Sequence, residues 1–313
     1  MRVVAALGGN ALLKRGEKQS VANQWANVRV AAAQLAEIVM AGHQLVITHG
    51  NGPQVGMLAL QSEAGPSDAQ APLDVLDAES EGMIGYMIEQ QMRNRLPAGA
   101  KVATLLTHVR VDASDPAFKK PQKPIGAVYS KAEAARIKAE RGWQMTADGD
   151  GWRRVVASPE PLEILQQPEI AVLMAAGVTV ICAGGGGIPC VRDANGFLTG
   201  AEAVVDKDRC SGLLATLLGA DRLLMLTDVD ATYLGFGTPN ARAIRRSDPT
   251  SLRGHRSDFR AGTMGPKIDG AIQFVTSTGG LAGIGRLEDA ANILRGVAGT
   301  IVDPLAKRLQ FAG

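Results

Sequence analysis

Short apolar runs alternate with amphipathic segments along most of the chain, and this rhythm predicts the order of its secondary structure. The runs at Val3–Leu7, Leu45–Thr48 and Val178–Ala183 have the length and composition of buried strands. Between the first two runs, apolar residues recur at spacings of three and four, which predicts a helix capped by Ser20 and stopped by Gly42.

The same rhythm continues through much of the remaining sequence. It predicts helices over residues 79–96, 162–176 and 211–218, and strands over residues 102–106 and 223–226. Short strands separated by helices favour an α/β fold, in which a mainly parallel central sheet is covered by helices on both faces.

The rhythm is interrupted between residues 109 and 161, where prolines and a basic run at 119–124 replace the apolar pattern. Within this stretch, the turn sequence Asp148-Gly149-Asp150-Gly151 separates two alternating segments, 143–145 and 152–156, and predicts a hairpin. We therefore expect residues 109–161 to leave the sheet as an inserted, protruding subdomain or lid.

Composition and charge narrow the class of protein. With 46% hydrophobic and 20% charged residues, the chain has the composition of an ordinary globular protein. A net charge of +2 and the absence of any apolar run near 18 residues give no reason to expect nucleic acid or membrane as a partner, and we expect a cytoplasmic location. The sequence contains neither a CxxC pair nor an HExxH motif, so we expect no metal site built from protein ligands.

Three of the predicted strands run directly into glycine-rich turns: Gly8-Gly9-Asn10, Gly50-Asn51-Gly52 and Gly184–Gly187. Glycine lets the backbone approach a ligand closely, and the N–H groups at a following helix start favour an anion such as phosphate. No GxxxxGK[ST] motif occurs, and Gly50–Gly56 does not have the GxGxxG spacing of a dinucleotide-binding turn. Three such turns indicate a large, multiply charged ligand held between several strand ends.

Three lysines lie where they could neutralise that ligand. Lys123 is flanked by prolines, Lys207 lies between Asp206 and Asp208, and Lys267 starts a predicted helix after a glycine-rich segment. Lysines fixed at strand ends or helix starts are well placed to bind phosphate oxygens. The two aspartates could position Lys207 or help to hold magnesium through water.

Together these residues resemble the amino-acid kinase superfamily and, within it, the carbamate kinases. The resemblance runs over almost the whole length and rests on residues 6–11, 49–56, 116–126, 151–159, 184–189, 202–208 and 265–268. Residues 226–230 resemble the nucleotide loop of the wider superfamily.

The resemblance implies one amino-acid kinase-like domain over residues 1–313, folded as a three-layer αβα sandwich with the inserted subdomain at 109–161. It also implies reversible phosphoryl transfer between ATP and carbamate, giving ADP and carbamoyl phosphate and serving ATP formation in catabolism. ATP or ADP would bind with Mg²⁺, which is held mainly through the nucleotide phosphates. The chain is expected to form a homodimer.

The resemblance also implies a role for each turn and lysine. Gly8, Gly9 and Asn10 would hold the phosphoryl group in transfer, and Gly50, Asn51 and Gly52 the carbamate. Lys123, Lys207 and Lys267 match phosphate-binding lysines, with Asp206 orienting them, while Gly184, Gly185, Gly186 and Asp228 belong to the nucleotide side. The irregular stretch 233–264 is expected to cover part of that side.

Two alternatives remain open from the sequence. The chain could be another acyl-phosphate-forming kinase of the same superfamily that acts on a small carboxylate, or a nucleotide-binding sensor without catalysis. The small pocket expected at Gly50–Gly52 favours a very small acceptor, and the complete lysine set favours catalysis.

Overall fold

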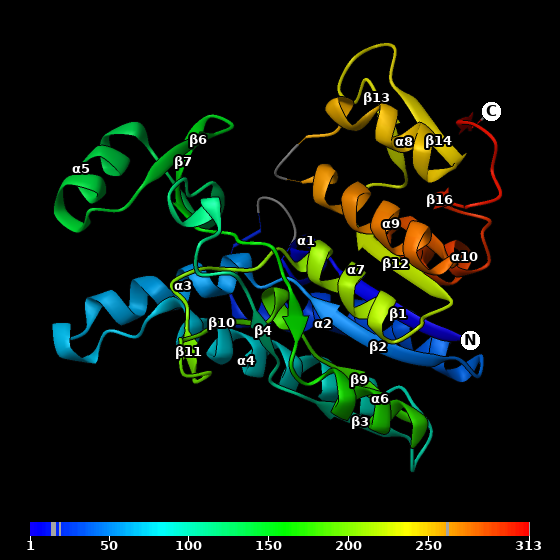
Figure 1. The fold of residues 1–313 in the computed structure, drawn as a ribbon, viewed down its shortest axis with the longest axis horizontal. Coiled ribbons are helices and arrows are strands. Elements are labelled where there is room, and N and C mark those ends of the chain that lie inside the picture. Colours follow the sequence, from blue (N-terminus) through cyan, green and yellow to red (C-terminus); the bar gives the residue numbers. More distant parts are fainter. Residues whose placement is uncertain (14–16, 19, 261–262, 313) are drawn as a thin grey trace.

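The computed structural model describes residues 1–13, 17–18, 20–260 and 263–312 (Figure 1). In this part of the chain, a ten-stranded sheet has the order β13-β14-β16-β15-β12-β1-β2-β9-β3, with β17 paired to β14. Its strands are β1 (Arg2–Leu7), β2 (Gln44–His49), β3 (Lys101–Thr104), β9 (Val178–Ile181), β12 (Arg222–Thr227), β13 (Thr232–Leu234), β14 (Arg242–Ser247), β15 (Leu281–Arg286), β16 (Thr300–Val302) and β17 (Gln310–Phe311).

The centre of this sheet is parallel. Strand β1 pairs in parallel with both β2 and β12, and the parallel pairing continues outward through β9 and β3 on one side and β15 on the other. Antiparallel pairs occur only toward the β13–β17 side of the described sheet. The prediction of a mainly parallel sheet is confirmed, and its parallel strands bring their carboxyl ends to one edge.

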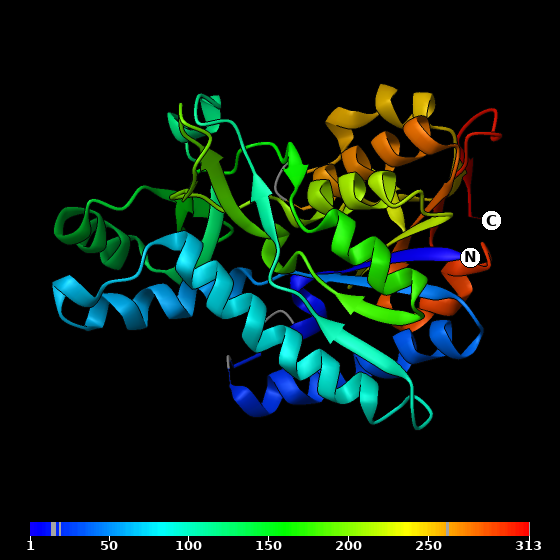
Figure 2. The same cartoon turned by 60° about the horizontal axis from the view of Figure 1, so that its bottom comes forward.

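Helices cover both faces, as the alternation along β1 requires. The side chain of Val4 belongs to a core shared with α6 (Gln167–Ala175), α7 (Lys207–Leu217) and α9 (Met264–Thr278). Its neighbours Val3 and Ala5 point to the other face, into a core shared with α2 (Val21–Met40), α4 (Leu73–Arg93) and α10 (Ala290–Leu294). These layers, seen from two directions in Figures 1 and 2, confirm the predicted αβα sandwich.

Several predicted element boundaries were wrong. The helix expected over 162–176 begins only at Gln167, because Glu163–Ile164 forms a strand (β8) that pairs with β4 (His108–Arg110). Pro168 then lies in the first turn of α6, where its missing N–H costs no helical hydrogen bond. The helices expected from 79 and 211 begin earlier, at Leu73 and Lys207. The first turn of α7 is polar and interrupts the apolar periodicity, whereas α4 already buries Leu73 and Leu76 in its first turn.

Two smaller sheets lie beside the main one. Strands β11 (Leu198–Gly200), β10 (Ile188–Arg192), β4 and β8 form one of them. The other consists of β5 (Lys123–Tyr129), β7 (Gly151–Val156) and β6 (Met145–Asp148), with α5 (Lys131–Arg141) between β5 and β6. In Figures 1 and 2 this second sheet and α5 project from the body of the molecule. The predicted β6–β7 hairpin is confirmed.

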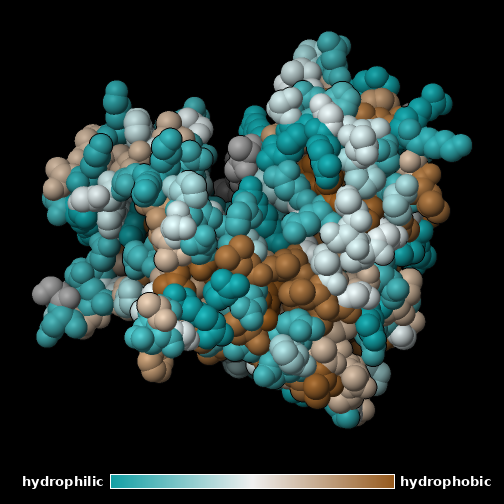
Figure 3. All heavy atoms as spheres, viewed as in Figure 1, coloured by the Kyte–Doolittle hydropathy of each residue, from teal (hydrophilic) through white to brown (hydrophobic). Residues whose placement is uncertain are grey.

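Helix α3 (Gly52–Ala64) follows β2 of the central sheet and packs against β5 of the projecting sheet. A Cβ atom added to Gly56 would lie 1.9 Å from the Cα of Gly126 in β5, so the two backbones touch without any side chain between them. Glu63, near the end of α3, pairs with Arg141 and Arg154 of the projecting part. In Figure 3 the molecule is notched between this part and the region of β13 and α8 (Pro249–Gly254).

None of the helices in the described ranges combines the length and apolarity needed to cross a membrane.

Candidate active site

A cavity of about 500 Å³ opens at the carboxyl ends of β1, β2 and β12. Most of the predicted site residues line it. They are Gly8, Gly9, Gly50, Asn51, Gly52, Lys123, Gly185, Asp206, Lys207, Asp228 and Lys267. Backbone from both ends of the sequence thus meets at one point, as expected where parallel strands end at a common edge.

The first two glycine turns are packed backbone against backbone. The N–H of Gly8 donates to the carbonyl oxygen of Leu226 at 2.8 Å, and a Cβ at Gly8 would lie 2.9 Å from that oxygen. The N–H of Gly50 donates to the Leu7 carbonyl oxygen, and a Cβ at Gly50 would lie 3.0 Å from the Gly9 nitrogen. Glycine is therefore required here to bring the turns after β1, β2 and β12 into contact.

Helix α3 begins at the second turn with its first-turn N–H groups uncapped. Its N-cap residue, Asn51, makes no side-chain capping bond, and the N-cap of α9, Thr263, makes none either. Helix α7 also starts at the cavity wall, at Lys207. Uncapped N–H groups and the positive ends of helix dipoles favour bound anions, so the backbone itself makes this cavity suited to phosphate.

The third glycine turn lies beside the second. Residues Gly184–Gly186 form a 3₁₀ turn in which Gly185, with φ +70°, lines the cavity. A Cβ at Gly185 would lie 2.2 Å from the Nδ2 atom of Asn51. Gly184 and Gly186 lie behind the cavity wall, whereas Asp228 lies across the sheet, after β12. The assignment of this turn to the nucleotide stays a prediction, since its nearest neighbour is the proposed acceptor turn.

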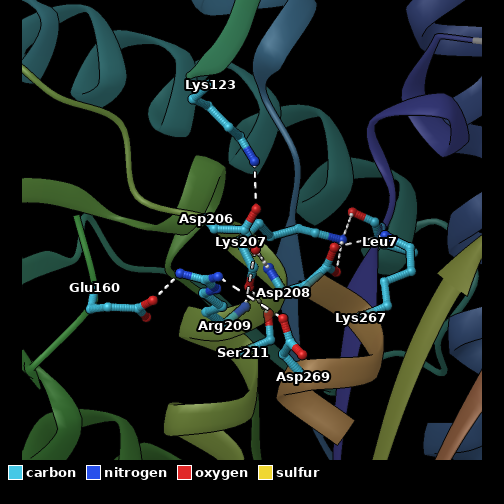
Figure 4. A network of polar contacts seen from close by, with 10 residues as sticks. All are labelled: Leu7, Lys123, Glu160, Asp206, Lys207, Asp208, Arg209, Ser211, Lys267 and Asp269. Atoms are coloured by element: carbon cyan, nitrogen blue, oxygen red, sulfur yellow. Dashed lines mark hydrogen bonds and ion pairs between the residues drawn. The ribbon is translucent and has the colours of Figure 1, made fainter. Parts of the chain in front are cut away.

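The lysines converge on the start of α7, as Figure 4 shows. Asp206 caps this helix through the N–H groups of Asp208 and Arg209, and its Oδ2 atom accepts a hydrogen bond from Lys123 at 2.5 Å. Asp208 pairs with Lys207 at 2.9 Å through Oδ1 and with Lys267 at 2.7 Å through Oδ2. The ammonium of Lys207 also donates to the Leu7 carbonyl oxygen. Three predicted lysines, from β5, α7 and α9, therefore share two carboxylates.

Burial and pairing set the charges of this network. Burial lowers the pKa of Lys207 to about 8 although Asp208 opposes the change. Burial would likewise lower the pKa of Lys267, but the neighbouring Asp208 outweighs it and the pKa is raised. For Asp206 and Asp208, burial is outweighed by the adjacent lysines, and the pKa of each carboxyl lies below its ordinary value. At neutral pH the network consists of ion pairs ready to exchange partners with phosphate oxygens.

A second group of buried acids lies on α4, behind the second glycine turn, Gly50–Gly52. The Nδ2 atom of Asn51 donates to Asp77 at 2.9 Å and to Ser80 at 2.8 Å. Glu81 accepts from the N–H groups of Gly184 at 2.8 Å and Thr107 at 3.1 Å. Burial raises the pKa of Glu81 to about 8 and raises the pKa of Asp77 well above its ordinary value. Helix α4 thus holds both turns through hydrogen bonds rather than ion pairs.

One predicted site residue lies only partly within the described structure. The backbone of Asn10 belongs to the short helix α1 (Gly9–Leu12), and its side chain lies outside the described residues. Its assignment to the phosphoryl group therefore stays a prediction.

Sequence reasoning left several lining residues without a role. Arg153 of the β6–β7 hairpin lines the cavity, as do Tyr233, Phe236 and Met264 from the irregular stretch 233–264. Arg153 lies in the segment 151–159, which contributed to the resemblance, and follows the turn at 148–151. Nothing else in the sequence indicates that its side chain lines the cavity. Tyr233, Phe236 and Met264 thus bring the stretch 233–264 to the cavity, while its assignment to the nucleotide side stays a prediction.

The comparisons with known proteins agree with this geometry. The family model described as the amino acid kinase family matches residues 1–282. The chain is 51% identical to a carbamate kinase of Haemophilus influenzae, with 99% of each chain covered, and 50% identical to one of Rhizobium meliloti, with 96% and 93% covered. It superposes with a TM-score of 0.87 on the structure of a carbamate kinase from Giardia lamblia bound to AMP-PNP, at 41% identity over 96% of this chain and 98% of that one. The chain therefore belongs to the amino acid kinase family and, within it, to the carbamate kinases.

Proposed function

We propose that this chain transfers a phosphoryl group reversibly between ATP and carbamate, with ADP and carbamoyl phosphate on the other side of the reaction. The observation that carries the proposal is the meeting of Lys123, Lys207 and Lys267 around two carboxylates beside the glycine turns. The relatives that match over nearly their whole length are carbamate kinases, and they do not favour a different acyl kinase or a sensor without catalysis.

The chemistry asks little of the protein beyond position and charge. A carboxylate oxygen of carbamate forms a bond to the terminal phosphorus of ATP while the bond from that phosphorus to the ADP oxygen breaks. Negative charge spreads over the oxygens of the phosphoryl group in between, and donors fixed in advance stabilise it. Lys123, Lys207 and Lys267 would supply these donors, and Asp206 would hold Lys123 at the cavity until phosphate replaces the carboxylate.

The turns divide the cavity between the two substrates. Gly8 and Gly9 would hold the phosphoryl group at the centre, and Gly50, Asn51 and Gly52 the carbamate at the start of α3. The nucleotide would extend toward Asp228, Tyr233 and Phe236, where the wall becomes partly aromatic.

Mg²⁺ would accompany the nucleotide, bound mainly by its phosphates. The Asp228 carboxylate lines the cavity after β12 and is an oxygen ligand of the type that Mg²⁺ accepts. Among the described residues, no three His, Cys, Asp or Glu side chains gather as they would around a metal held by protein alone. Bound magnesium would neutralise charge on the phosphates while the lysines position them.

Four further predictions belong to this proposal. The part that projects around β5–β7, within the predicted insertion 109–161, would act as a lid because Lys123 and Arg153 reach the cavity from it. A homodimer and ATP formation as the physiological direction are proposed from the family resemblance, and a cytoplasmic location is proposed from the charge and apolar pattern of the sequence. Apolar side chains gather around β4 on the face shown in Figure 3, a surface suited to a second copy.

The test is a coupled assay that measures ATP formed from carbamoyl phosphate and MgADP. We expect saturable formation of ATP that depends on both substrates and on Mg²⁺. If ATP does not form at any reasonable enzyme concentration, while the protein still binds MgADP in calorimetry, the chain is a nucleotide-binding protein and the proposed function is wrong.

A further inference from the structure

The side-chain amide of Asn51 has a fixed orientation, and Ser80 reveals which way it faces. The Ser80 hydroxyl donates its only hydrogen to the backbone carbonyl oxygen of Asp77, at 2.9 Å. Its oxygen can therefore only accept in the 2.8 Å contact with Asn51, so the atom of the amide that faces it must be the NH₂ group.

Asp77 accepts the second hydrogen of the amide once Ser80 has fixed its orientation. Its Oδ1 atom lies 2.9 Å from the Asn51 nitrogen, and both side chains are buried. With one N–H directed to Ser80 and the other to Asp77, α4 uses both donors of the amide. Among the described residues none donates to the Asn51 carbonyl oxygen, although Asn51 lines the cavity. Within the described residues, that oxygen is therefore the atom of the amide that keeps its hydrogen-bonding capacity for a ligand.

Gly185 keeps the amide in this plane from the other side. An added Cβ would lie 2.2 Å from the Asn51 Nδ2 atom and 2.6 Å from its Oδ1 atom. The backbone of the third turn therefore packs against the amide, and the Asn51 side chain cannot move closer to Gly185. Three elements, α3, α4 and the Gly184–Gly186 turn, thus fix a single acceptor at the small end of the cavity.

We propose that Asp77 and Ser80 are positioning residues that set acceptor specificity, by fixing the Asn51 carbonyl oxygen as an acceptor for an amino group. The inference rests on the proposed function and deepens it. Carbamate and carbamoyl phosphate carry an NH₂ group that donates to this oxygen. Acetate and acetyl phosphate have the same shape with a methyl group in its place, and they leave the buried oxygen unpaired. A site built to bond a substrate N–H rejects the analogue that lacks it.

The experiment compares carbamoyl phosphate with acetyl phosphate as phosphoryl donors to MgADP and reports the ratio of their kcat/KM values. In the double variant Asp77→Ala, Ser80→Ala, the amide can turn, and we expect the preference for carbamoyl phosphate to fall about tenfold, the effect of one lost hydrogen bond. Ser80→Ala alone should lower it about threefold. General damage to the fold lowers both activities alike and does not change this ratio.

Two further variants complete the test. Asp77→Asn keeps an acceptor oxygen for the amide and should keep the ratio within about twofold of the unmodified protein, whereas Glu79→Gln, exposed on the same helix, should leave it unchanged. An unchanged ratio in an active double variant overturns the inference while the proposed function stands. If the double variant does not fold, an unchanged ratio in Ser80→Ala overturns it instead. Failure of the unmodified protein to use carbamoyl phosphate would count against the proposed function.

Discussion

Two pairs of buried acids lie behind the same cavity and differ in how their charge is handled. Asp206 and Asp208 pair with lysines, and their pKa values are lowered. Asp77 and Glu81 accept hydrogen bonds from an amide and from backbone N–H groups, and burial raises their pKa values. The first pair holds ammonium groups in place where, in the proposed reaction, phosphate charge would develop. The second pair holds the Gly50–Gly52 and Gly184–Gly186 turns through hydrogen bonds, where the proposed small acceptor would bind.

The difference shows how one cavity can serve two ligands of unequal charge. Near the lysines, the proposed function has an arriving phosphate replace the carboxylates as the partner of ammonium groups that are already in place. Near Asn51, hydrogen bonds fix shape and donor pattern and add no further cation to the acceptor end. The predictions below separate these two roles, in order of decreasing effect.

The largest effect is expected from Asp208→Asn, which removes the shared counter-charge of Lys207 and Lys267. Both ammonium groups would remain buried beside each other, and leaving a buried charge unpaired costs about 3–5 kcal/mol. The free energy of unfolding from urea titrations measures this loss. As a control, Glu140→Ala removes the exposed partner of Arg136 and should cost only about 0.3–0.5 kcal/mol. Equal losses in the two variants would contradict the ion-paired character of the first pair.

The next effect concerns activity. Lys123→Ala should lower kcat by about 10²–10³, the scale for removing one donor that stabilises transition-state charge. Steady-state ATP formation measures it, with Lys120→Ala, exposed in the same basic run, as the matched control. Turnover close to that of the control would remove Lys123 from the mechanism.

The smallest effect, taken over one pH unit, is a pH dependence that has opposite signs for the two pairs. In the folded protein the pKa of Glu81 is raised from 4.5 to about 8, so its contribution to stability falls as pH rises between these values, by at most about 1.4 kcal/mol per pH unit. The lowered pKa values of Asp206 and Asp208 give a contribution that is present above about pH 4 and lost on acidification below it. Glu81→Gln should flatten the stability curve between pH 5 and 8 and leave the acid limb in place. A curve parallel to that of the unmodified protein would exclude Glu81 as its source.

The central sheet and its glycine turns could be predicted from the sequence because both depend on local pattern. Apolar runs mark β1, β2, β9 and β12, and the glycines after three of them mark strand ends. The strands β13–β17 and the four-stranded sheet were not predicted. Strands β13 and β17 are short and only partly buried and carry little periodicity, whereas β15 is buried but its apolar run is interrupted by two glycines.

The candidate site was predictable in its members but not in its pairings. Lys123, Lys207 and Lys267 stand out by their local contexts, and all three line the cavity. Their carboxylate partners, however, include residues far away in the sequence, as with Lys267 and Asp208. The contact of Asp77 with Asn51 is of the same kind, because helix α4 meets that turn only through the tertiary fold.

The contact between Gly56 and Gly126 has a consequence for how this protein can change over generations. Helix α3 begins at the acceptor turn, and β5 begins at Lys123, so this bare meeting of two backbones fixes how far apart the two stand. Because the contact is made by backbone atoms, any side chain at position 56 would force α3 and β5 apart. Substitutions on the outer surfaces of α3 and of the projecting sheet leave this contact unchanged. A substitution at Gly56 would change the distance between the start of α3 and Lys123.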